Sequence, residues 1–541
     1  RLSRVWPLAL EPAADRPGRR RQIVRGRRRQ TIPGRRRQII QGRRRQIIPG
    51  RRRRIGRGRR RRRTVRKRRR LFRPRDVVER AVARHLDAFA DFVGDGSAPL
   101  NATRWGLARY EDAIAGIQWS LDRNGGSNAT TRALHDLLIK EADAVMAAAK
   151  NGSAWEAWFR TGDPFAPFDD SEPTGTSHLI RHGVDIGEAF KVGPLKWRAS
   201  NATDDLNNTK AAIEWADAWL GMPDGMYFGD EEVGGQHSPS RGTETCSVVE
   251  TAYALRAAYE ITGEAAHFDR LERVVFNALP AALWPDATAN VYHHASNQIE
   301  TGADQYAYDL YYCCTANVHQ GWPKFVAGLV GLAEDDTPVV AGLAPSTTVL
   351  PDGTTLDVGG AYPFADDATL ASDRNLTVRL RVPCWVENFT ADGVPLAPCG
   401  FADVALVENV SMPISWTAPL ETRQWRPSDR DGQAAITPGA IEVFRGPLTL
   451  ALRPETAVNE TNIYGTIKRR EVMLEEDATW NYALDVASFE VSLHDVPSPP
   501  FAADLPPAVS VTARARVVDA WTTAGGARGV AFPPASPLDA P

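Results

Sequence analysis

The chain has 541 residues, of which 43% are hydrophobic and 24% are charged, and its formal net charge is zero. This length allows two or more domains, and we predict no membrane span because no apolar run reaches about 18 residues. The zero net charge hides two opposite parts. Residues 1–75 hold 33 Lys and Arg against two acidic residues, so the rest of the chain carries 33 basic against 64 acidic residues.

Residues 1–75 are a low-complexity repeat in which arginine runs follow glycines that recur every eight residues from Gly18 to Gly58. Like-charge repulsion and a shortage of apolar residues predict that this segment is disordered. It is either an arm for nucleic acid or another polyanion, or a translated non-coding repeat without a function. We favour the second interpretation and expect no nucleic-acid partner, because the acidic body of the chain gives no sign of one.

From about residue 77 to about residue 335 the apolar spacing is helical. Three stripes step by three or four residues, which places each stripe on one face of a helix that packs against neighbours. They are Leu107, Tyr110, Ile114, Ile117 and Leu121; Val248, Ala252, Leu255 and Tyr259; and Phe268, Leu271, Val275 and Leu279. We expect Gly263 to end the second helix as a C-cap. Repeated amphipathic helices of this kind suggest a helical toroid.

After about residue 336 the pattern changes to a period of two. Leu376, Val378, Leu380 and Val382 alternate with polar residues, and residues 441–448 have the pattern of a strand that leads into a turn. Short strands with frequent Pro and Gly favour a β-sandwich. We therefore predict an α+β multidomain protein with four parts: the Arg-rich segment 1–75, a helical domain 76–335, a β-sandwich region 336–520 and a loose tail 521–541.

The sequence also predicts a secreted protein or one of the secretory-pathway lumen. Nine asparagines begin Asn-x-Ser/Thr, far more than the roughly two expected by chance, and such glycosylation acceptors belong on the surfaces of secreted proteins. They are Asn101, Asn128, Asn151, Asn201, Asn207, Asn375, Asn388, Asn409 and Asn459. Cys384 and Cys399 fit the same compartment as a possible disulfide that closes a short loop, although two unpaired thiols stay an alternative.

The other three cysteines, together with one glutamate, form a candidate metal site. Three thiolates and a carboxylate are a complete tetrahedral ligand set for zinc, and the set is Glu244, Cys246, Cys313 and Cys314. Residues two apart in an extended segment point the same way, so Glu244 and Cys246 could face one ion. The vicinal pair should lie on a turn or irregular loop, before a helix that starts near Trp322.

Two other interpretations of these cysteines stay open. They could be small core residues, because free cysteine is commonly buried, or the vicinal pair could form a disulfide.

The segments around the ligands resemble a known family. They are RHGV at 181–184, GDE at 229–231, ETC at 244–246 and CCTANVHQGWPKF at 313–325. Over roughly residues 105–455 the chain resembles glycoside hydrolase family 127, the β-L-arabinofuranosidase family. This resemblance implies an (α/α)6 barrel and a bound Zn²⁺. The family's early barrel helices would lie upstream of residue 105, where residues 77–104 can supply one of them, so we expect an incomplete barrel.

The resemblance also implies the catalytic groups. A retaining glycosidase needs a nucleophile and an acid/base roughly 5 Å apart. In the family the nucleophile is a zinc-bound cysteine, which corresponds to Cys313, and metal coordination deprotonates such a thiol. The acid/base must be a carboxylic acid kept protonated near the working pH. Within residues 229–232 we select Glu231, with Glu232 in reserve; the alternative for this run is a solvated acidic turn.

His182 and Tyr292 correspond to substrate-binding residues of the family, although a histidine on a helix is otherwise a satisfied surface or core residue. We therefore expect a retaining hydrolase that releases terminal β-L-arabinofuranose from plant-type glycans or hydroxyproline-linked arabinosides. One alternative is the same mechanism acting on a different sugar. Another is a non-catalytic carbohydrate-binding protein that keeps zinc as a structural ion. The sequence makes no prediction of the oligomeric state.

Overall fold

The computed structural model describes residues 6–7, 74–94, 109–123, 129–148, 182–229, 233, 242–284, 289–295, 312–425, 440–463, 467–498, 500–501 and 505–519. The chain divides into two compact units, one of Glu11–Arg80 and one of Arg1–Leu10 with Ala81–Pro541. In the smaller unit the described residues are the beginning of α1 (Pro74–Gly94). Within the segment that the sequence predicts to be disordered, Trp6 and Pro7 form a short strand, β1, paired with β4.

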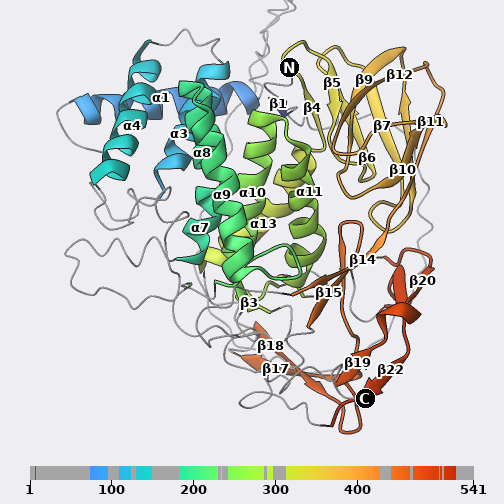
Figure 1. The fold of residues 1–541 in the computed structure, drawn as a ribbon. Coiled ribbons are helices and arrows are strands. Elements are labelled where there is room, and N and C mark those ends of the chain that lie inside the picture. Colours follow the sequence, from blue (N-terminus) through green and yellow to red (C-terminus); the bar gives the residue numbers. More distant parts are fainter. Residues whose placement is uncertain are drawn as a thin grey trace, which may run out of the picture. The chain divides into compact units, whose positions relative to one another are not determined.

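The helices of the larger unit come first along the chain (Figure 1). They are α3 (Tyr110–Arg123), α4 (Ala129–Ala148), α7 (Gly183–Ala189), α8 (Val192–Ser200), α9 (Thr203–Leu220), α10 (Thr245–Thr262), α11 (Ala265–Arg273), α12 (Leu279–Ala281) and α13 (Tyr312–Ala327). A π-helical turn, Val274–Ala278, joins α11 to α12. None of the described helices is long and apolar enough to cross a membrane.

The helix α10 carries the predicted stripe of Val248, Ala252, Leu255 and Tyr259, all of which are buried. Helices α7, α8, α11 and α13 all contact α10, so it is buried on nearly every side. Gly263 follows it with a φ of 71° and donates its N–H to the carbonyl oxygen of Tyr259 at 2.8 Å. The predicted glycine C-cap is confirmed, because this left-handed conformation is the one that glycine adopts without strain.

The other two stripes also face the core. Phe268, Leu271, Val275 and Leu279 are buried along α11, the π-helical turn and α12. In the remaining stripe Tyr110, Ile114 and Ile117 are buried and Leu121 is half-buried on α3; Leu107 lies outside the described residues.

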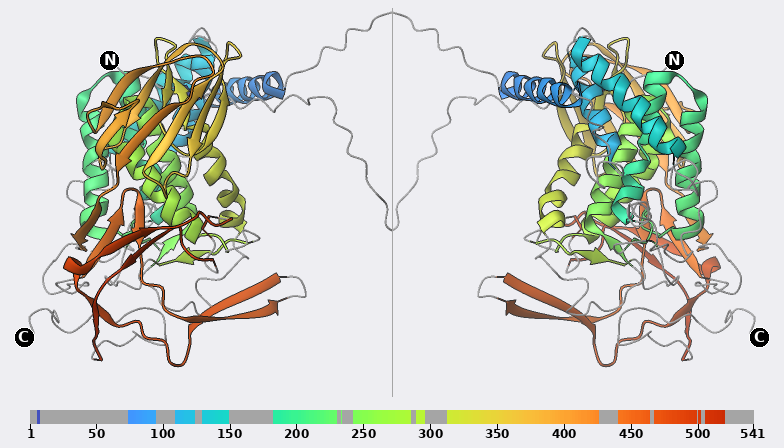
Figure 2. Two further views of the ribbon diagram at one scale, coloured as in Figure 1. Left: turned by 90° about the vertical axis from the view of Figure 1, so that its right-hand side faces the viewer. Right: turned by 90° about the vertical axis from the view of Figure 1, so that its left-hand side faces the viewer.

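Strands dominate the chain after Val330, as the period of two predicts. One sheet has the order β1-β4-β5-β9-β12 and a second has the order β11-β10-β13-β8-β7-β6; the two lie next to each other in all views (Figures 1 and 2). Their bounds are β4 Val330–Leu332, β5 Pro338–Val340, β6 Ser346–Val349, β7 Thr355–Gly360, β8 Asp367–Ser372, β9 Leu376–Val382, β10 Glu387–Ala391, β11 Val394–Pro395, β12 Gly400–Leu406 and β13 Met412–Thr417.

Smaller sheets follow toward the C-terminus. They are β14-β15-β16 (Leu420–Gln424, Ile441–Arg445, Leu448–Leu450), β17-β18 (Thr456–Ile463, Ile467–Leu474), β19-β22 (Tyr482–Leu484, Ala515–Val517) and β20-β21 (Glu490–Leu493, Val509–Thr512). The strand predicted to begin at Ile441 is β15, and it turns into β16 at Gly446 and Pro447. The chain is therefore an α+β multidomain protein. The predicted disulfide between Cys384 and Cys399 is formed.

Strand β9 follows the predicted alternation except at Arg381. Val378, Leu380 and Val382 are fully buried, but the side chain of Arg381, expected among the polar residues, is only 1% exposed. Its guanidinium donates to Glu272 Oε2 at 2.6 Å, pairs with Asp269 and lies 4.6 Å from the centre of the Phe268 ring. All three partners belong to α11, so this arginine joins the five-stranded sheet to the helices.

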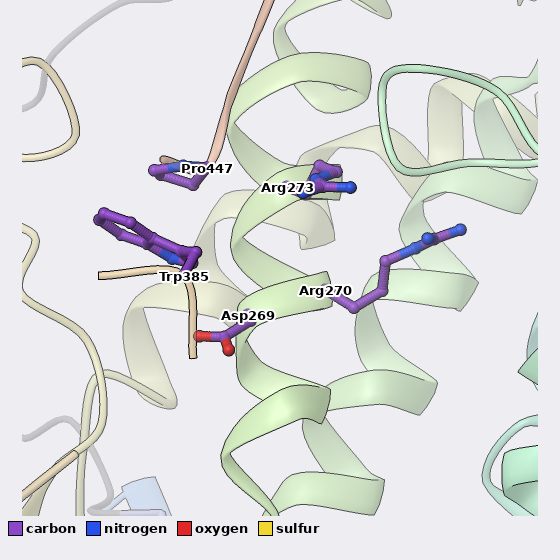
Figure 3. A pocket seen from close by; sticks show the side chains of 5 residues that line it. All are labelled: Asp269, Arg270, Arg273, Trp385 and Pro447. Carbon is purple, nitrogen blue, oxygen red and sulfur yellow. The ribbon is translucent and has the colours of Figure 1, made fainter. Parts of the chain in front are cut away.

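The same end of α11 meets two loops from the strand region. Figure 3 shows Asp269, Arg270 and Arg273 on α11 together with Trp385 and Pro447, and these five residues line a small pocket. Asp269 also accepts the backbone N–H of Cys384 at 2.8 Å. Asp269 therefore links α11 to the loop that follows β9.

Candidate metal centre and active site

The four residues predicted as metal ligands lie together, and their ligand atoms are all within 4.8 Å of one another. The Sγ atoms of Cys246 and Cys314 are 3.3 Å apart, and Cys314 Sγ lies 3.4 Å from Glu244 Oε1. Cys313 Sγ lies 3.9 Å from the same oxygen and 4.0 Å from Cys314 Sγ. The two halves of the set, about 70 residues apart in sequence, thus converge on one point.

The backbone brings them there by a route that differs from the prediction. Glu244 ends the short strand β2 (Thr243–Glu244) and is the N-cap of α10, with φ −69° and ψ 138°, so the expected extended conformation is right for it. Cys246 is already in the first turn of α10, however. The helical turn nevertheless brings Cys246 Sγ to within 4.8 Å of the Glu244 carboxylate.

The vicinal pair is also helical. Cys313 and Cys314 lie in the first turn of α13, which begins at Tyr312, and Pro323 lies inside the helix. The prediction of a loop before a helix starting near Trp322 is therefore wrong. Successive side chains on an α-helix are about 100° apart around the axis, so both sulfurs can approach one ion from a single turn without an irregular loop.

The distances fit a tetrahedral cation. Zinc–sulfur bonds of about 2.3 Å and slightly shorter zinc–oxygen bonds place neighbouring ligand atoms roughly 3.5–3.8 Å apart, close to the separations here. A disulfide would need the sulfurs about 2.05 Å apart, and all three cysteines are free. The vicinal disulfide is thus not formed, whereas the residues present suit a zinc ion.

Burial divides the ligands unequally. Glu244, Cys246 and Cys314 are at most 4% exposed, whereas Cys313 is exposed. Cys246 and Cys314 form an apolar cluster with Val184 and Tyr292, as the core-cysteine interpretation expects. That interpretation does not account for the buried carboxylate of Glu244 among them, whose Oε2 receives no hydrogen bond. A buried carboxylate of this kind is stabilised by a nearby cation, which can be a metal ion or the protonated imidazole of His182, whose Nε2 lies 3.9 Å from Oε2.

The electrostatics of the cluster point the same way. Partial burial, followed by the charges of Cys246 and Glu244, raises the pKa of Cys313 to about 11. Like-charged groups at this spacing cannot ionise together without a counter-charge. A divalent cation supplies it, and would hold the thiols as thiolates.

His182 and Tyr292 both lie at the cluster. His182 immediately precedes α7, and its Nε2 is 3.9 Å from Glu244 Oε2. Tyr292 is 5% exposed, and its carbonyl oxygen accepts the backbone N–H of Thr245 at 2.9 Å. It directly precedes β3 (His293–His294), in which His293 is paired with Glu244. The structure therefore brings both predicted sugar contacts next to the ligand set.

A family match covers this part of the chain. Residues 225–327, which include α10, the first turn of α13 and all four ligands, match the beta-L-arabinofuranosidase GH127 catalytic domain. Over these residues the chain is similar to glycoside hydrolase family 127. No protein of curated function matches it by sequence.

Solved structures also resemble this chain in fold. A glycoside hydrolase superposes with a TM-score of 0.51 and 13% identity, over 70% of this chain and 69% of that chain. A GH127 beta-arabinofuranosidase gives a TM-score of 0.42 at 15% identity, over 71% of each chain. A GH127 beta-L-arabinofuranosidase from Geobacillus stearothermophilus T6 gives 0.43 at 12% identity, over 74% of this chain and 68% of that chain.

The predicted acid/base, Glu231, and its reserve, Glu232, lie outside the described residues. The described residue that comes closest before them is Gly229, whose carbonyl oxygen accepts the N–H of Glu244 at 3.3 Å. Gly229 is also bridged to Thr243. The last described residue before the acidic residues is therefore hydrogen-bonded to the metal-ligand residue Glu244.

Two further residues that lie near the ligand set were not predicted from the sequence. Asp185 is completely buried and its Oδ1 lies 3.6 Å from His182 Nδ1. Arg109, 76 residues away, donates its Nε–H to the same oxygen at 2.8 Å. The spacing of three between His182 and Asp185 is the signal that could have found the first, because residues three apart can meet at a helix start. Nothing local marks Arg109.

Proposed function

We propose that the chain is a retaining glycoside hydrolase that releases terminal β-L-arabinofuranose from glycans or glycoproteins. The observation that carries this proposal is the unequal burial of the ligand set: Cys313 is an exposed residue, whereas the other three ligand residues are buried. A nucleophile has to be reachable by substrate, whereas the other ligands do not. The choice of sugar follows the description of the matching family.

The proposed cofactor is Zn²⁺ held by Glu244, Cys246, Cys313 and Cys314, and when bound it keeps the sulfurs deprotonated and fixed in place. Cys313 attacks the anomeric carbon and forms a carbon–sulfur bond as the glycosidic carbon–oxygen bond breaks. Glu231 gives its proton to the departing oxygen. Glu231 then takes a proton from water, whose oxygen replaces the sulfur at the anomeric carbon. Two displacements on opposite faces retain the configuration.

The remaining parts of the proposal concern binding and fold. His182 and Tyr292 contact the sugar, and Glu232 replaces Glu231 if the latter does not face the glycosidic oxygen. The helices form an (α/α)6-type toroid, and the two larger sheets form a β-sandwich. Their proposed limits are residues 76–335 and 336–520, with the Arg-rich segment 1–75 and the tail 521–541 outside both.

Zinc content and turnover test this function together. The full chain, purified under reducing conditions, is expected to contain one zinc ion and to hydrolyse p-nitrophenyl β-L-arabinofuranoside. Chelation should remove both zinc and activity, because the thiols return to their protonated form without the cation. Added Zn²⁺ should restore both. Zinc without turnover on this or other aryl glycosides would favour the carbohydrate-binding alternative. Hydrolysis of another aryl glycoside, but not of the arabinofuranoside, would show that the enzyme acts on a different sugar.

We also propose that the protein passes through the secretory pathway as a glycoprotein. The sequon asparagines within the described residues are all exposed: Asn201, Asn207, Asn375, Asn388, Asn409 and Asn459. The disulfide between Cys384 and Cys399 suits an oxidising compartment.

Secreted expression in a eukaryotic cell tests this localisation. The protein is expected to lose mass when N-glycans are removed enzymatically, and an Asn409→Gln variant should lose one glycan. A secreted protein whose mass does not change on this treatment would contradict glycosylation.

A further inference from the structure

A row of charged side chains leads from the metal ligand Glu244 into the helices. His182 stands between two carboxylates, with Nε2 3.9 Å from Glu244 Oε2 and Nδ1 3.6 Å from Asp185 Oδ1. Asp185 in turn accepts the Nε–H of Arg109 at 2.8 Å. Each link joins groups of opposite charge whenever His182 is protonated, and the row ends at the one carboxylate of the ligand set.

Burial makes this row stiff. The side chain of Asp185 is 0% exposed, that of Glu244 is 3% exposed and that of His182 is 17% exposed. Arg109 is clamped a second time, because its Nε also lies 3.3 Å from Glu188 Oε2 on the same helix as Asp185. Asp185 and Glu188 lie one turn apart on α7, so Arg109 fixes the orientation of that helix. The imidazole of His182 therefore lies between two carboxylates that are themselves buried.

We propose that Asp185 is a positioning residue for the metal centre: through the imidazole of His182 it sets the orientation of the Glu244 carboxylate, and so the affinity of the site for zinc. Partners of a metal-binding carboxylate or imidazole commonly change metal affinity by about 10- to 100-fold when they are removed. The inference rests on the proposed zinc centre. It also constrains the proposed sugar contact, since His182 would meet the sugar in the orientation that the two carboxylates set.

The competing explanation is that Asp185 only stabilises the fold by binding Arg109. A double-mutant cycle separates the two. Zinc affinity is measured by competition with a chromophoric chelator for the full-length wild type, Asp185→Asn, His182→Ala and the double variant. Asp185→Asn is expected to weaken zinc binding about tenfold or more. In the His182→Ala background the same change should have no further effect, because the residue that transmits it is gone.

A matched control is available on α9. Asp205 is also a buried aspartate paired with a cation, with its Oδ1 3.5 Å from Lys196 Nζ, and it is not among the groups around the metal site. Asp205→Asn should lower thermal stability without changing zinc affinity. If Asp185→Asn does not fold, Arg109→Gln tests the same row from a side chain that is 35% exposed, and it too should weaken zinc binding only when His182 is present.

The outcomes are distinct. Unchanged zinc affinity in both Asp185→Asn and Arg109→Gln would overturn the inference, and so would a loss that is equally large with and without His182. A wild-type chain that binds no zinc would overturn the proposed function, and this inference with it. Zinc binding that depends on Asp185 in a chain without glycosidase activity would leave the inference standing while the proposed reaction fails.

Discussion

Replacing Cys313 by serine is expected to lower kcat for p-nitrophenyl β-L-arabinofuranoside by about 10³-fold or more, the scale of loss seen when a covalent nucleophile is removed. A serine hydroxyl stays protonated where a thiolate forms, and its oxygen is a poorer leaving group in the second displacement. The measurement is steady-state turnover together with zinc content. Zinc should fall less than activity, because Glu244, Cys246 and Cys314 remain as buried ligands.

Two further variants make this result specific. Gln320→Ala changes a half-buried residue of the same helix, whose amide donates to Asn317 Oδ1 at 2.7 Å, and it should leave both zinc and turnover near wild type. Cys314→Ser removes a buried ligand and should lose zinc and activity together. A Cys313→Ser protein that keeps a tenth or more of the wild-type kcat would rule out this residue as the nucleophile.

The largest expected effect on stability belongs to Arg381. Its replacement by alanine leaves Asp269 and Glu272 without their guanidinium partner in the core, and breaking a buried ion pair in this way costs about 3–5 kcal/mol of unfolding free energy. Burial raises the pKa of Glu272 to about 7 even beside Arg381, so this carboxylate is already easier to protonate than an exposed one. Chemical denaturation followed by tryptophan fluorescence would measure the loss.

The same strand offers a control. Arg379 also binds two carboxylates, with Nε 2.9 Å from Asp403 and Nη2 3.2 Å from Asp335, but both of these partners are more than half exposed. Arg379→Ala should therefore change stability little, as surface ion pairs usually do. Similar losses in the two variants would show that Arg381 gains nothing from its burial.

The comparison of sequence with structure separates what residue types can reveal from what they cannot. The stripe on α10, the alternation on β9 and the glycine cap at Gly263 were predictable, because each depends on the local period of apolar residues. The ligand set was predictable as a chemical set. The helical first turn that holds Cys313 was not, because vicinal cysteines do not by themselves distinguish a helical turn from a loop.

Long-range charge pairing escaped the sequence altogether. Arg381 reads as an exposed member of an alternating strand, and its buried partner Glu272 lies 109 residues earlier in the chain. Arg109 and Asp185 are separated by 76 residues. In both cases the partner of the charged residue lies on a different element, far away in sequence. The local spacing of apolar residues therefore could not identify either pair.

The short distance between two sulfurs of the ligand set has a consequence for the stability of the site toward oxidation. Cys246 and Cys314, with Sγ atoms 3.3 Å apart, need to approach by only about 1.3 Å to reach the length of a covalent S–S bond. Spacing that suits a shared cation therefore also favours oxidation once the cation is lost. In an oxidising compartment, protein that has shed its metal would be trapped in an inactive form, and its recovery would need reduction before reloading.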